Sequence, residues 1–109
     1  MAKLIVSPLA RADIREIGDY ISRDLRNPDA ALRLIRRFRE AMSPLRQFPD
    51  LGSPLPAGGK RGIPYRYLVC GSYMIFYHVA DETVHIDRVL YGRRDYMALL
   101  FGDQLDDEE

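Results

Sequence analysis

Residues 73–91 read YMIFYHVADETVHIDRVLY, two runs of alternating side chains joined by Asp81-Glu82. Alternation with a period of two is typical of β-strands, and a short polar pair between two such runs is typical of a hairpin turn. If Val79 opposes Val84, one face of the hairpin is apolar and the other mixes aromatic with polar groups. The apolar face then carries Tyr73, Ile75, Tyr77, Val79, Val84, Ile86 and Leu90, and the mixed face carries Met74, Phe76, His78, His85, Asp87, Val89 and Tyr91.

Two more strands and two helices are expected before this hairpin. Residues 3–6 form a short apolar run, and residues 66–70 precede the turn at Gly71-Ser72. Ser7-Pro8 and Asn27-Pro28 each combine an N-capping residue with a proline suited to the first helical position. Apolar residues then recur at helical spacing, at Leu9, Ile14, Ile17, Tyr20 (or Ile21) and Leu25 in the first helix and at Ala31, Ile35, Phe38, Met42 and Leu45 in the second.

The order of these elements predicts an α+β fold, β-α-α-β-β-β, with a short helix at residues 95–101. Pro44 is expected to loosen the end of the second helix because it removes one hydrogen bond of the ladder. A helical hairpin covers one face of a small antiparallel sheet, so we expect the mixed face to be open and to be the working surface. Residues 1–102 are expected to form a single domain, followed by an acidic tail at residues 103–109.

Composition places the chain among small intracellular proteins. Cys70 is the single cysteine of the 109 residues, so no disulfide can form within the chain, and a reducing cytoplasm is expected. The apolar run at the N-terminus is too short for a signal peptide or a membrane span. Charge is segregated: residues 1–66 hold thirteen Lys and Arg against seven Asp and Glu, whereas residues 67–109 hold three against nine. A basic body suits an anionic partner, either nucleic acid or an acidic protein segment.

Three stretches resemble the RelE/ParE toxin superfamily in their order and spacing. They are SPLARADI with the following YI at residues 7–21, FPDLG at residues 48–52, and YMIFY at residues 73–77 with RVLYGRRD at residues 88–95. The resemblance implies a microbial-RNase-like α+β toxin that is neutralised by a cognate antitoxin wrapping around it.

The superfamily holds two activities, and the residues favour one of them. RelE-like members cut mRNA on the ribosome with cationic and proton-transferring side chains. Met74 stands where these relatives carry a strand arginine, and Leu100 or Phe101 stands where they carry a proton-transferring residue, while Arg94 matches a family arginine. The resemblance is closer to ParE, which implies inhibition of DNA gyrase by protein–protein binding, a ParD-like antitoxin and no cofactor. An mRNA endoribonuclease, with His78, His85, Tyr91 or Tyr96 as substitutes, and a non-toxic stability or adaptor protein are the alternatives.

The candidate site residues fall into two sets, and no native metal site is expected. Arg88 has the parity of the apolar face, so a salt bridge to Asp13 or Glu16 of the first helix is expected. Arg33, Arg36, Arg37 and Arg39 are the predicted antitoxin contacts. The predicted target or anion contacts are Arg93, Arg94, Tyr91, Met74, Phe76, His78 and His85.

Overall fold

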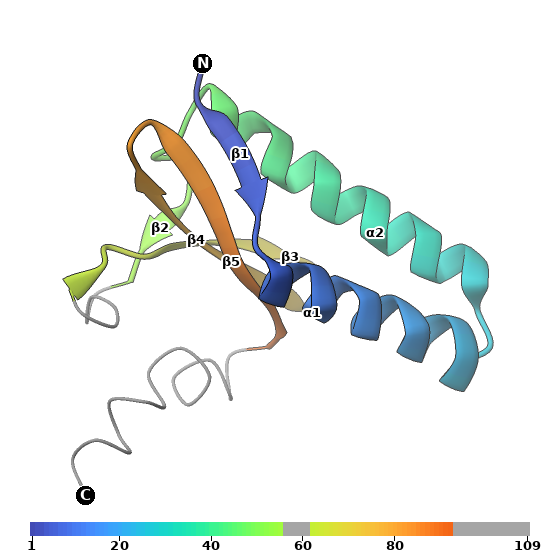
Figure 1. Ribbon diagram of the computed structural model, residues 1–109. Helices are drawn as coiled ribbons and strands as arrows, with labels where there is room; N and C mark the ends of the chain where they lie inside the picture. The colour runs from blue at the N-terminus through green and yellow to red at the C-terminus, as the bar shows by residue number, and fades with distance from the viewer. Residues whose placement is uncertain (56–61, 93–109) are drawn as a thin grey trace, which may run out of the picture.

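The computed structural model describes residues 1–55 and 62–92, and it places two helices on one face of a five-stranded sheet (Figure 1). The helices are α1 (Pro8–Asp19), which continues into a π-helical turn, η1 (Tyr20–Asp24), and α2 (Pro28–Met42), which continues into a 3-10 turn, η2 (Ser43–Arg46). The strands are β1 (Lys3–Val6), β2 (Ser53–Pro54), β3 (Arg66–Cys70), β4 (Tyr73–Ala80) and β5 (Thr83–Tyr91).

The sheet has the order β1-β5-β4-β3-β2, in which β1 pairs with β5 in parallel and all other pairs are antiparallel. The predicted α+β fold and its element order are therefore confirmed, with the two-residue β2 as an addition. The helix expected at residues 95–101 and the acidic tail at residues 103–109 lie outside the described residues.

Local sequence signals explain where both helices begin. The Ser7 hydroxyl accepts a hydrogen bond from the Ala10 amide at 3.0 Å, and the Asn27 side chain accepts one from the Ala30 amide at 3.1 Å. Each cap satisfies an amide that the helix itself leaves unpaired. The regular α-helix ends at Met42 and continues as a 3-10 turn over Ser43–Arg46, so Pro44 interrupts α2 near its end, although the turn is tightened and not loosened as predicted.

The buried side of α1 agrees with the predicted one only in part. Ile14 and Ile17 pack against the core as predicted. Leu9, Tyr20 and Leu25 are exposed, and Ala10, Asp13 and Gly18 are the buried residues of the helix. The small residues let α1 approach α2 closely, since a Cβ atom on Gly18 would lie 3.1 Å from Ile35 Cδ1. Periodicity counts large apolar residues, so it misses a helix face that packs through small ones.

A β-bulge in β5 changes the predicted faces of the last strand. Tyr77 pairs with Ile86, but Phe76 pairs with Arg88, which leaves Asp87 as the extra residue. Beyond the bulge the alternation is reversed, so the prediction is wrong for Val89, Leu90 and Tyr91, the last of which pairs with Tyr73 and contacts its ring. Val89 is buried with the helices, and Leu90 is buried on the opposite face.

The face away from the helices is not open, contrary to expectation. Met74 is 5% exposed and Phe76 is 0% exposed. They form a small second core with Leu55 and Leu90, and Tyr65 and Tyr67 pack against it. The segment around β2 thus covers part of a face that a two-helix hairpin cannot reach.

Candidate functional site

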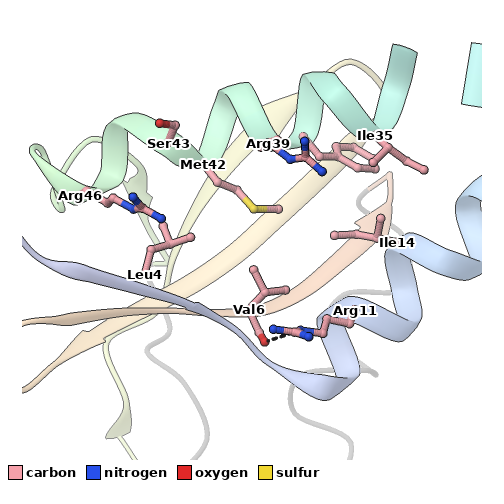
Figure 2. A pocket seen from close by; sticks show the side chains of 10 residues that line it. Leu4, Val6, Arg11, Ile14, Ile35, Arg39, Met42, Ser43 and Arg46 are labelled. Carbon is pink, nitrogen blue, oxygen red and sulfur yellow. Dashed lines mark hydrogen bonds between the residues drawn. The ribbon is translucent and has the colours of Figure 1, made fainter. Parts of the chain in front are cut away.

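A groove of about 520 Å³ lies between α2 and the pair formed by β1 and α1 (Figure 2). Its apolar lining comes from all three elements. Figure 2 shows Leu4 and Val6 on β1, Ile14 on α1, and Met42 on α2 directed into the same space. Ile35 and Phe38 complete this lining. A groove of this kind is suited to apolar side chains of a partner.

Three arginines, Arg11, Arg39 and Arg46, border the groove, and no acidic residue is among those that line it. The Arg11 side chain is fixed, because its Nε donates to the Val6 carbonyl at 3.2 Å. Arg39 is on α2 and Arg46 is on the η2 turn that follows it, and both line the groove together with Ile35 and Met42. The groove therefore combines an apolar floor with a positively charged rim.

Strand β1 contributes an open edge beside this groove. The Lys3 amide donates to the Glu82 carbonyl and the Ser7 amide donates to the Ile86 carbonyl, both on the β5 side. Because successive residues of a strand alternate, the amides of Leu4 and Val6 point away from β5. Among residues 1–55 and 62–92, no strand pairs with this outer edge. An extended partner segment would find the amides of Leu4 and Val6 here, whereas the Val6 carbonyl already accepts from Arg11 Nε.

The structure separates the four arginines predicted to bind an antitoxin. All four are exposed, but only Arg39 lines the groove. The Arg37 guanidinium lies beside the β3–β4 turn, 3.6 Å from where a Cβ atom on Gly71 would stand. Sequence reasoning missed Arg11 and Arg46. For Arg46, the seven-residue spacing from Arg39 was an available signal.

The predicted salt bridge of Arg88 to the first helix is confirmed. Arg88 Nε and Nη2 each lie 2.8 Å from a carboxylate oxygen of Asp13, and the Val89 amide donates to the same carboxylate at 2.9 Å. The hydrogen bond to Asp13 raises the pKa of Arg88, against the effect of burial. This contact holds α1 against β5 just beyond the end of β1, where the Ser7 hydroxyl also donates to the Asp87 carbonyl. Its position identifies Asp13 and Arg88 as structural residues.

His78 and His85 face each other across β4 and β5, as predicted, with stacked rings 4.8 Å apart. His78 Nδ1 and Asp87 Oδ2 are 2.6 Å apart, and the Tyr65 ring contacts His78 edge-on. Burial raises the pKa of Asp87, and the hydrogen bond from His78 opposes that rise. In the described part of the chain, no three His, Cys, Asp or Glu side chains are arranged to hold a metal ion.

The other predicted target contacts have different surroundings. Tyr91 is exposed and packs edge-on against Tyr73. Met74 and Phe76 are buried, so their side chains are not presented to a partner. The remaining positions that carried the sequence argument lie outside the described residues; they are Arg93, Arg94, Tyr96, Leu100 and Phe101.

No helix within residues 1–55 and 62–92 has the length and apolar character needed to cross a membrane. Cys70 is buried, and burial raises the pKa of its thiol, which disfavours the reactive thiolate.

Known proteins match most of this chain. Toxin RelE2 of Caulobacter vibrioides is 33% identical over 94 residues, which cover 86% of this chain and 99% of that protein. A solved structure described as "Chromosomal ParDE TA system from P. aeruginosa" superposes with a TM-score of 0.69 at 24% identity, covering 85% of this chain and 98% of the other. The family described as ParE toxin of type II toxin–antitoxin system, parDE, matches residues 4–96. This chain therefore belongs to the ParE toxin family of type II toxin–antitoxin systems.

Proposed function

We propose that the groove between α2 and β1 is the site at which a cognate antitoxin neutralises this toxin inside the cell. The observation that carries the proposal is the composition of the groove, an apolar floor bordered by Arg11, Arg39 and Arg46 without an acidic residue. The ParDE description of the structural neighbour supports the proposal that a ParD-like protein is the partner.

The chemistry of the groove describes the segment that would fill it. Apolar side chains on one side of the segment enter between Ile35, Met42 and Val6, while carboxylates beside them meet the arginines. A segment that is disordered when free and folds on contact suits a long, open groove, because it adapts to both helix and strand edge.

Reversing charge at the groove tests this proposal. The double variant Arg39→Glu, Arg46→Glu places repulsion against an acidic segment, so antitoxin affinity should fall by about 100-fold at moderate salt. The matched control is Arg33→Glu, Arg36→Glu, which changes the same charge on exposed positions of α2 outside the groove. Titration calorimetry with the cognate antitoxin measures the affinity of both variants. Equal losses in the two variants would assign the effect to overall charge and refute the groove.

We further propose that the toxin acts by binding DNA gyrase rather than by cutting RNA. Membership of the ParE family supports this target class. Met74 supports it too, since a buried methionine occupies the strand position at which nuclease relatives carry an arginine. Toxin freed of antitoxin should inhibit supercoiling by purified gyrase and leave ribosome-bound mRNA intact, and Arg94→Ala should weaken the inhibition by removing one contact.

An endoribonuclease is the second candidate, and the pairing of His78 with Asp87 favours it. A carboxylate on Nδ1 orients the ring and leaves Nε2 available as a general base. Under this alternative, expression yields mRNA fragments cut at regular codon positions, and His78→Ala with His85→Ala abolishes them. Under the gyrase proposal, the same double variant keeps full toxicity. Absence of growth arrest on expression would instead favour the non-toxic adaptor.

A further inference from the structure

The turn at residues 48–51, which follows η2, exposes two large apolar side chains. Phe48 is 60% exposed and Leu51 is 54% exposed. The Leu51 amide donates to the Phe48 carbonyl at 3.0 Å, so both residues belong to one tight turn. Exposed apolar side chains grouped on one turn are typical of a contact surface rather than of scattered surface residues.

Side chains from two strands hold this turn in a fixed shape. The fully buried Tyr77 hydroxyl donates to the Pro49 carbonyl at 2.7 Å and accepts from the Gly52 amide at 2.8 Å. Arg66 Nη1 donates to the carbonyls of Asp50 and Gly52. No residue with a side chain fits at position 52 without a shift of its neighbours, because a Cβ atom on Gly52 would stand 2.7 Å from the Tyr77 side chain. A turn that is already ordered loses little conformational entropy when it binds.

The 48–51 turn and the groove are complementary in both polarity and charge. Asp50 lies between the two apolar residues, 3.7 Å from Arg66, and its carboxylate side chain is 88% exposed. The groove offers the opposite, an apolar floor with Arg39 and other arginines on its rim. No residue of the turn lines the groove of its own chain. The two features can therefore meet only between two copies.

We propose that, in the absence of antitoxin, the 48–51 turn of one copy docks into the groove of a second copy, with Asp50 facing Arg39. Arg46 lines the end of the groove only two residues before Phe48, so turn and groove lie next to each other. Two copies related by a twofold axis exchange their turns reciprocally, which closes a dimer and leaves no free groove. An antitoxin segment competes with this dimer for the groove, and this consequence alone rests on the proposed function.

Sedimentation velocity of the full-length toxin, free of antitoxin, tests the dimer. Between about 1 and 100 μM, the range expected for an interface of modest size, the weight-average mass should rise from monomer to dimer. Phe48→Ser should weaken association at least about tenfold. Leu32→Ser, which removes an equally exposed leucine from α2 outside the groove, should leave it unchanged.

A charge exchange identifies the contact and does not depend on the fold of the Phe48 variant. Asp50→Lys and Arg39→Glu should each weaken the dimer about tenfold, and the two changes combined in one chain should restore it. A monomer throughout the concentration range would overturn the proposal. So would a double variant whose loss of dimer affinity equals the summed losses of the two single variants. Because these measurements contain no antitoxin, a failure here leaves the antitoxin proposal to its own affinity test.

Discussion

The two faces of the sheet are both closed by apolar packing, but they are closed by different means. Two regular helices cover the first face around Phe38 and Tyr77, and they leave a groove where α2 passes β1. The second face is covered without a helix among the described residues, by Leu55 and neighbouring tyrosines over Phe76. The groove, with its apolar floor and arginine rim, therefore lies at the margin of the helix layer.

This difference shows why a partner surface is hard to place from strand alternation alone. The groove lies where α2 passes β1, which is an edge strand of the sheet. The side chains that border the groove come from β1, α1 and α2, so no single periodic segment of the sequence reveals it.

The largest expected effect is on stability, and it compares the two cores directly. Phe38 and Phe76 are both buried, at 1% and 0% exposure. Replacing either by alanine should lower the free energy of unfolding by about 3–5 kcal/mol, because each change removes a full aromatic side chain and leaves a cavity. Urea denaturation measures both. A loss under about 1 kcal/mol for Phe76→Ala, with the full loss for Phe38→Ala, would mean that the second face is open after all.

A somewhat smaller effect is expected at the ion pair that joins the helix layer to the sheet. Asp13→Ala removes three hydrogen bonds and leaves Arg88 partly buried without its carboxylate, which should destabilise the fold by about 3 kcal/mol. Thermal unfolding of Asp13→Ala, Arg88→Ala and the double variant gives the interaction energy between the two side chains, separate from the contribution of each side chain alone. Additive losses would show that the two side chains do not stabilise each other.

The smallest effect concerns the carboxylate of Asp87, which is the extra residue of the bulge in β5. Burial raises the pKa of Asp87 in the folded protein above its ordinary value. A raised carboxyl pKa means that the folded protein holds the proton more tightly than the unfolded chain does, so stability is lost as pH rises through the folded-state value. As pH rises from about 4 to neutral, the free energy of unfolding of Asp87→Asn should therefore increase relative to that of the wild type, by less than about 1 kcal/mol. If the wild type instead became more stable relative to the variant over that pH range, the pKa of Asp87 would not be raised in the folded protein.

Much of the fold was predictable because its signals are local. Ser7-Pro8, Asn27-Pro28 and Pro44 mark the helix ends where the structure has them, and the pairing of His78 with His85 followed from the hairpin register. The bulge at Asp87 was not predictable, because one inserted residue leaves no trace in the residue types around it. It accounts for the exchanged faces of Val89 and Leu90.

The candidate site was predicted only in part, for a related reason. The arginine-rich sequence of α2 indicated Arg39 as a contact residue. It did not distinguish Arg39 from the other arginines of α2, which do not line the groove; they are Arg33, Arg36 and Arg37. Arg11 joins the groove only because β1 and α1 fold against α2. Contacts between segments distant in sequence decide this surface.

Hydrogen–deuterium exchange of the toxin with and without its antitoxin tests the central claim most directly. In the free toxin, the amides of Leu4 and Val6 point away from β5 and should exchange quickly. At a toxin concentration below the range in which the free toxin dimerises, antitoxin binding should protect residues 3–6 and 35–46, while residues 63–69, in β3 and the segment before it, should exchange as before. Protection gained at residues 63–69, with none at residues 3–6, would place the antitoxin on the second face and contradict the account.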